Sequence, residues 1–128
     1  MFSKEEKEKF RQGLKLRIYI WSVRLVKYCR KLGNIKDRAA WVIVDQLIRS
    51  GTSVCANYIE AIASPSTKDF RKFLGYSLKS GNESKFWLCL IRDIHIDPDQ
   101  QERDWLLKEI VELSNILGKS VSTMQKSN

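Results

Sequence analysis

Apolar and small residues recur at intervals of three and four along almost the whole chain, and this spacing restricts the fold more than any other feature. In residues 36–63, for example, the series includes Ala40, Val44, Leu47 and Val54. Such spacing places one apolar stripe along one face of an α-helix. No segment alternates apolar and polar residues with a period of two over a useful length. The sequence therefore predicts an all-α protein.

Three breaks interrupt the helical spacing, at "LGNIKD", "SPSTKD" and "DIHIDPDQ". Asn34, Ser66 and Asp97 are the expected N-caps, with Pro98 at the first helical position of the last segment. The breaks leave four predicted helices, at residues 4–32, 36–63, 67–94 and 98–124. Short loops force consecutive helices to run antiparallel, so residues 1–128 are expected to form one up-down-up-down four-helix bundle.

The stretch "QLIRSGTSVCANYIEA" at residues 46–61 is unusual for a helix because it is rich in small and polar residues. Gly51 costs a helix about 1 kcal/mol relative to alanine, a cost that close helix packing can offset. The third predicted helix also has small side chains at its middle, around Gly81. The second and third helices are therefore expected to cross tightly near Gly51 and Gly81.

Charged and amide side chains flank this small-residue seam. They are Arg49, Asn57, Glu60 and Glu83. One interpretation is a solvated face, the usual location of charged side chains. The other is a polar network at a helix or subunit interface, with Arg49 paired to Glu60 or Glu83.

The first helix carries two apolar stripes instead of one. The first stripe contains Leu14, Ile18, Trp21, Leu25 and Leu32. The second stripe lies on the opposite side and contains Leu16, Tyr19, Val23 and Val26. A helix that is apolar on two sides is typical of burial on both. We therefore expect the second stripe to form a subunit interface; the alternative is that its members are scattered exposed residues.

The net charge of +8 lies entirely within residues 1–38, whereas residues 93–112 hold seven acidic residues against two basic ones. A concentrated positive charge indicates an anionic partner such as nucleic acid. The candidate phosphate-binding residues are Arg17, Arg24, Lys27, Lys31, Arg38, Lys68, Arg71 and Lys72. Alternatively, the basic face pairs with the acidic fourth helix of a neighbouring subunit or faces water. No motif for base-specific recognition is present.

Other function classes have little support in the sequence. No run of 18 apolar residues and no signal peptide is found, so a cytoplasmic protein without membrane contact is expected. The cysteines, Cys29, Cys55 and Cys89, lack metal-ligand spacing and are interpreted as small core residues. His95 lies beside Asp97, but that carboxylate is already assigned to a helix cap. No catalytic motif occurs, so no enzyme activity, cofactor or metal is expected.

A set of polar and apolar residues at fixed spacings runs through the middle of the chain. It consists of Gln46, Leu47, Arg49, Ser53, Asn57 and Glu60, followed by Asp69, Phe70, Phe73, Leu74, Ser80 and Glu83. With this pattern the chain resembles the four-helix-bundle family encoded in intervening sequences of bacterial large-subunit rRNA genes. Ala61 departs from the glycine usual after the glutamate. The resemblance implies a homo-oligomeric ring, commonly a pentamer, without catalytic activity. A more distant branch, the accessory variability protein of diversity-generating retroelements, binds nucleic acid and a reverse transcriptase.

Two functions are consistent with these features. The first is a homo-oligomeric accessory protein that binds the RNA or DNA backbone through basic surfaces repeated around a ring. The second is a protein-interaction scaffold that recruits a partner such as a reverse transcriptase without contacting nucleic acid.

Overall fold

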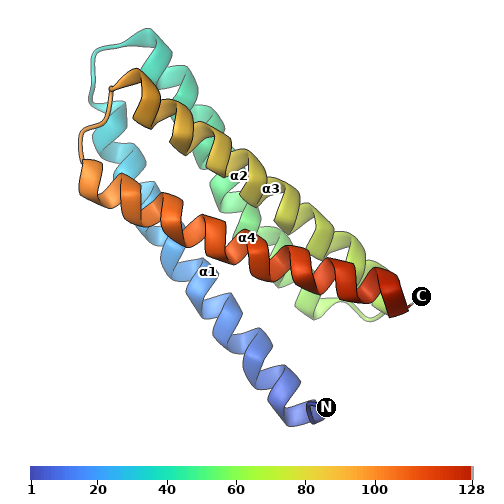
Figure 1. Ribbon diagram of the computed structural model, residues 1–128. Coiled ribbons are helices and arrows are strands. Elements are labelled where there is room, and N and C mark those ends of the chain that lie inside the picture. Colours follow the sequence, from blue (N-terminus) through green and yellow to red (C-terminus); the bar gives the residue numbers. More distant parts are fainter. Residues whose placement is uncertain (128) are drawn as a thin grey trace.

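The computed structural model describes the backbone of residues 1–127 and the side chains of residues 1–124. Four helices account for nearly all of it: α1 (Lys4–Gly33), α2 (Arg38–Ala63), α3 (Thr67–Ile94) and α4 (Gln100–Ser127). The four helices pack side by side, while the N-terminal end of α1 extends away from the others (Figure 1). No strand occurs within residues 1–127. The prediction of an all-α four-helix bundle is confirmed.

The helix starts are fixed by side-chain caps, and two of these differ from expectation. Ser66 caps α3 as predicted, since its hydroxyl accepts a hydrogen bond from the Asp69 amide at 3.1 Å. Asp37 rather than Asn34 caps α2, accepting from the Ala39 amide at 2.8 Å. Asp99 rather than Asp97 caps α4, accepting from the Glu102 amide at 3.1 Å. Helices α2 and α4 therefore begin two residues later than the spacing predicted.

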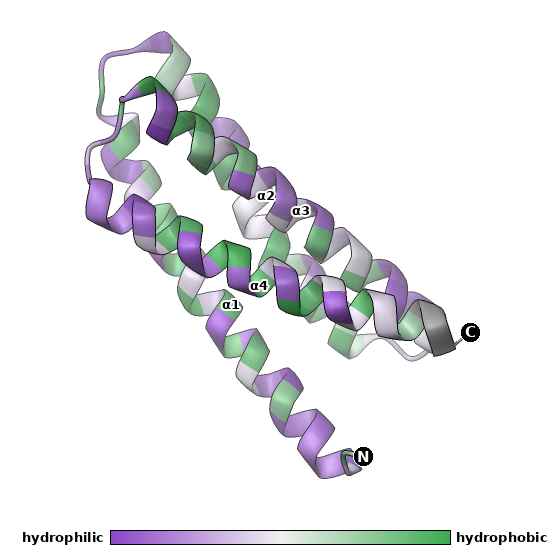
Figure 2. Ribbon diagram, in the orientation of Figure 1, coloured by the Kyte–Doolittle hydropathy of each residue, from purple (hydrophilic) through white to green (hydrophobic). Residues whose placement is uncertain are grey.

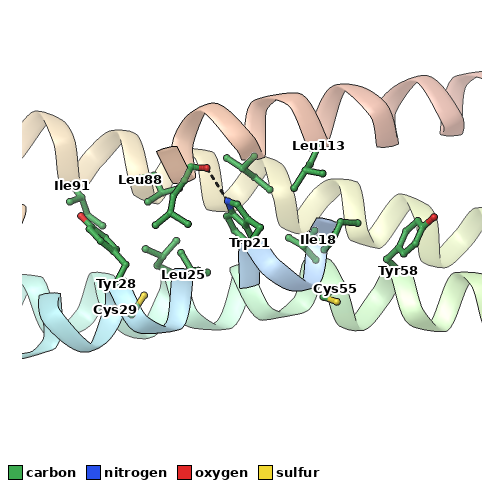
Figure 3. Packing of buried hydrophobic residues seen from close by; sticks show 14 of the residues in the cluster. Ile18, Trp21, Leu25, Tyr28, Cys29, Cys55, Tyr58, Leu88, Ile91 and Leu113 are labelled. Carbon is green, nitrogen blue, oxygen red and sulfur yellow. Dashed lines mark hydrogen bonds between the residues drawn. The ribbon is translucent and has the colours of Figure 1, made fainter. Parts of the chain in front are cut away.

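The core is centred on Trp21, which is fully buried. Its Nε1 donates a hydrogen bond to the Leu106 carbonyl of α4 at 2.9 Å, shown as a dashed line in Figure 3. Ile18 and Leu25 flank it along α1, and Leu88 of α3 is buried in the same part of the core (Figure 3). By contrast, residues 1–10 are all exposed, and the projecting end of α1 is mainly hydrophilic (Figure 2). Within α1, the contribution to the core therefore begins at Leu14.

The two seam glycines do not mediate the contact between α2 and α3, contrary to the sequence prediction. A Cβ added to Gly51 would lie 1.9 Å from Leu25 Cδ2 of α1. A Cβ added to Gly81 would lie 2.9 Å from Ser114 Oγ of α4. Gly51 therefore makes room for α1, and Gly81 makes room for α4.

Serines bring α2 and α3 together instead. The hydroxyl oxygens of Ser50 and Ser84 lie 3.0 Å apart, and Ser77 Oγ donates to the Val54 carbonyl at 2.7 Å. All three serines are buried. Their small side chains let the backbones approach, and each polar group finds a partner.

Gly51→Ala is expected to destabilise the fold. Overpacking against Leu25 costs about 1–3 kcal/mol, while the helix propensity of alanine offsets about 1 kcal/mol, which leaves a net loss of about 1 kcal/mol. The matched control is Gly13→Ala, because no atom lies within 4 Å of the added Cβ at Gly13. That variant should gain about 0.5–1 kcal/mol. Urea denaturation followed by circular dichroism measures both, and equal stabilisation of the two variants would contradict this packing.

Candidate nucleic-acid and subunit interfaces

The basic row of α1 is paired with the acidic residues of α4 in the same chain. Arg17 donates to the two Glu109 carboxylate oxygens at 2.7 and 2.8 Å and also contacts Glu112. Arg24 donates to Glu102 at 3.1 Å through Nε, and Lys31 donates to Asp99 at 2.8 Å. The pairs run in opposite order along the two helices, so α1 and α4 are antiparallel.

Aromatic and electrostatic contacts reinforce this row of pairs. The guanidinium carbon of Arg24 lies 3.3 Å from the centroid of the Trp105 ring. The hydrogen bonds from Arg17 hold the pKa of the Glu109 carboxyl below its ordinary value. Glu109 therefore stays charged at neutral pH, as pairing with Arg17 requires.

The ion pairs divide the candidate phosphate-binding residues into two groups. Arg17 and Arg24 have their charge compensated by α4 carboxylates, and Lys31 by Asp99, the N-cap of α4. Lys27 and Arg38 are exposed and have no ion pair to any residue whose side chain is described. The acidic segment proposed to come from a neighbouring subunit is thus supplied within one chain.

The remaining three candidates gather in an open hollow of about 650 Å³ on α3. Its lining consists of Lys68, Arg71, Lys72, Gly75 and Tyr76 of α3 and Val121 of α4. Lysines at positions 68 and 72 are one helical turn apart, and Arg71 shares their face. We call this site the basic hollow.

One carboxylate moderates the charge of the basic hollow. Asp69 lies 3.7 Å from Lys72 Nζ, which also lies 4.8 Å from the centroid of the Phe73 ring. Lys68 and Arg71 have no ion pair among the side chains of residues 1–124. The hollow therefore keeps two uncompensated positive charges and a third that is partly compensated.

A second hollow, of about 260 Å³, lies between α1 and α2 and is mainly apolar. It is lined by Gln12, Lys15, Leu16, Tyr19, Cys55 and Ile59. Leu16 is 59% exposed and Tyr19 is 56% exposed, whereas Val23 and Val26 are half-buried. The predicted subunit-interface stripe therefore has its two largest side chains uncovered in the single chain.

The polar residues of α2 and α3 do not form the predicted ion pairs. Arg49, Glu60 and Glu83 are all exposed, and within residues 1–124 Arg49 pairs with neither glutamate. Asn57 Nδ2 donates to the Ser53 carbonyl at 2.9 Å, and Ser53 Oγ donates to the Arg49 carbonyl at 2.7 Å. Side chains here satisfy the backbone of their own helix, so an Arg49 pair with Glu60 or Glu83 is not part of the folded single chain.

Sequence comparison identifies the family. The model for the 23S rRNA-intervening sequence protein matches residues 14–119. The chain belongs to the 23S rRNA-intervening sequence protein family. Among curated proteins, none matches the chain.

A solved structure agrees with this assignment to the 23S rRNA-intervening sequence protein family. The chain is similar to the crystal structure of a protein of unknown function from the S23 ribosomal protein family of Bacteroides thetaiotaomicron. The TM-score is 0.78 and the sequence identity is 27%, and the match covers 88% of this chain and 97% of that one.

The metal-ligating residue types are dispersed over the described part of this family member, and Cys29 lies in its core. No three His, Cys, Asp or Glu residues gather there to hold a metal ion. Cys29 is buried, and burial raises the pKa of its thiol to about 12. At neutral pH Cys29 is therefore an unreactive core thiol. None of the helices within residues 1–127 has a segment long and apolar enough to cross a membrane.

Sequence reasoning missed the role of Asp97 at the α3–α4 loop. Its side chain is 2% exposed and lies 2.6 Å from Arg103, whose side chain is 9% exposed. Tyr28 of α1 donates to the same carboxylate at 2.7 Å. Burial, together with this hydrogen bond, raises the pKa of the Tyr28 hydroxyl far above its ordinary value, so it remains a donor. His95, in a left-handed conformation, turns the chain into this loop.

Tyr76 and Val121 were also absent from the predicted sites. The signal for Tyr76 is its position one turn beyond Lys72 and two turns beyond Lys68 on the same helical face. Val121 could not be found from the sequence, because its place in the lining depends on where the C-terminal half of α4 lies against α3.

Proposed function

We propose that this protein is a non-catalytic homo-oligomer that binds the phosphate backbone of RNA or DNA through its basic hollow. The observation that carries the proposal is the convergence of Lys68, Arg71 and Lys72 on one open hollow. The ion pairs of α1 support the proposal, because they compensate the α1 cations, whereas the cations of the hollow have no α4 carboxylate as a partner among the described side chains. Lys27 and Arg38 remain secondary contacts.

The oligomeric part of the proposal rests on the apolar hollow between α1 and α2. Exposed Leu16 and Tyr19 form the apolar part of its α1 side, and Ile59 forms part of its α2 side. Contiguous exposed apolar side chains are typical of protein interfaces. We assign this face to a second copy of the chain, in a ring of up-down-up-down bundles. A ring repeats the basic hollow once per subunit, and a pentamer would present five copies.

The hollow is tested by neutralising its cations. The variant Lys68→Ala/Arg71→Ala/Lys72→Ala should bind a fluorescent 20-mer about 20-fold more weakly than the parent at 50 mM salt, measured by anisotropy. The slope of log affinity against log salt should fall by about 2 to 3, which corresponds to three lost phosphate contacts.

The control removes equal charge elsewhere, through Lys9→Ala/Lys36→Ala/Lys108→Ala at exposed positions. It should bind nearly as the parent does. An equal loss in both triple variants would mean that only net charge matters and that the hollow is not the site. No binding of any 20-mer at 50 mM salt would favour the alternative, a scaffold that recruits a protein such as a reverse transcriptase.

A further inference from the structure

The basic hollow contains an aromatic side chain that phosphate binding alone does not need. Tyr76 is 48% exposed, although it belongs to the lining. Its ring meets the Phe73 ring edge to face, with centroids 5.9 Å apart and planes at 84°. Phe73 therefore fixes the orientation of Tyr76 while about half of Tyr76 stays accessible to solvent.

The lining of the hollow also has free space at Gly75, the residue before Tyr76 on α3. A Cβ added to Gly75 would meet no atom within 4 Å. Val121 of α4 adds an apolar side chain to the lining. At about 650 Å³ the hollow lies within the size range of small-ligand sites, which is large enough for a nucleobase.

The cations are placed to hold the backbone next to such a base. Lys68, Lys72 and Tyr76 succeed one another at single turns of α3, so about 5–6 Å separates neighbouring side chains. Lys72 is already engaged by Asp69 and Phe73, whereas Lys68 and Arg71 have no ion pair among the described side chains. Lys68 and Arg71 are therefore the principal phosphate contacts, about two turns and about one and a half turns from the aromatic ring.

We propose that the basic hollow prefers single-stranded nucleic acid, with Tyr76 stacking on one unpaired base while Lys68 and Arg71 hold adjacent phosphates. This inference rests on the proposed function and extends it to the strandedness of the ligand. Bases within a duplex are stacked on one another and cannot reach the ring, whereas an unpaired base can leave its stack. Phosphate contacts alone would serve a duplex equally well.

The test compares one sequence in two forms, a labelled single-stranded 20-mer and its duplex, each made as RNA and as DNA. Tyr76→Ala should weaken single-strand binding by about 5- to 150-fold, the range for removing one base–aromatic stack, and should leave duplex binding unchanged. Tyr76→Phe should retain the parent affinity, because stacking does not need the hydroxyl. Phe86→Ala, which removes another exposed aromatic ring of α3, is the matched control. The RNA and DNA arms show whether the sugar contributes.

The outcomes separate this inference from the proposed function. If Tyr76→Ala changes neither affinity, or both equally, while the triple variant of the cations abolishes binding, the hollow binds phosphate without stacking and the strandedness inference is wrong. If no 20-mer binds but poly-glutamate does, the hollow binds acidic protein and both proposals fail. Selective loss of single-strand binding in Tyr76→Ala, with Phe86→Ala unaffected, supports the inference.

Discussion

Trp21→Ala is expected to lower the free energy of unfolding by about 3–5 kcal/mol, the usual cost of removing a fully buried aromatic side chain. Trp21 has no exposed surface and donates a hydrogen bond to the Leu106 carbonyl, so its ring joins α1 to α4. It also lies against Gly51, since Trp21 Cη2 is 3.4 Å from the Cβ position there. The cavity left by alanine would thus border α1, α2 and α4.

Urea denaturation at fixed protein concentration measures the effect, because oligomerisation makes apparent stability depend on concentration. The control is Trp41→Ala. Trp41 is 52% exposed, although its Nε1 also donates a hydrogen bond, to the Ile35 carbonyl at 2.9 Å. Its loss should cost about 1 kcal/mol. Equal destabilisation by the two substitutions would mean that the layer around Trp21 is not the centre of the core.

Asp97→Ala is the second substitution with a large expected effect, a loss of about 3–5 kcal/mol of folding stability. Among the described side chains, it would leave the buried guanidinium of Arg103 with the exposed Asp104 carboxylate, at 2.8 Å, as its one ion-pair partner. It would also remove the acceptor of the Tyr28 hydroxyl. Breaking a buried ion pair from one side costs more than the pair itself contributes, because the remaining charge is desolvated and uncompensated.

Two comparisons isolate that cause. Asp93→Ala removes a carboxylate that is 64% exposed and pairs with Arg92, so it should change stability by less than about 1 kcal/mol. The double variant Asp97→Ala/Arg103→Met removes both buried charges and should be more stable than Asp97→Ala alone. A double variant that is no more stable than the single one would show that Asp97 acts through Tyr28 or the loop, not through Arg103.

The fold was predictable because each of its determinants is local in sequence. The three- and four-residue apolar spacing identifies four helices, and the breaks at Gly33, Pro65 and Pro98 delimit them. The two helix starts that differ by two residues lie where two candidate caps stand close together, Asn34 and Asp37 before α2 and Asp97 and Asp99 before α4. Spacing alone does not tell which carboxylate turns toward the helix and which toward the core.

The residues through which α2 contacts α3 could not be predicted from the sequence, since adjacent residues on a helix point about 100° apart. Ser50 therefore faces α3 while Gly51, the next residue, faces α1. Deciding between them requires the rotation of each helix in the bundle. That rotation is set by side chains far away in the sequence, such as Trp21.

The sequence shows which charged residues gather on each helix, but it does not show which of them form ion pairs. The basic row of α1 and the acidic segment of α4 are both evident in the sequence, and Arg17 and Arg24 have the same seven-residue spacing as Glu109 and Glu102. Only the adjacency of α1 and α4 shows that these rows compensate each other within one chain. The same adjacency moves the proposed nucleic-acid site from α1 to the basic hollow on α3.

The most direct test of the account is the molar mass by light scattering coupled to size exclusion, at low and moderate salt, with and without a single-stranded RNA 20-mer. The account predicts a mass several times the 15.0 kDa of one chain under all conditions, with RNA co-eluting at low salt and released at moderate salt. A particle of 15.0 kDa that leaves the RNA unbound at low salt would contradict both the oligomer and the nucleic-acid site.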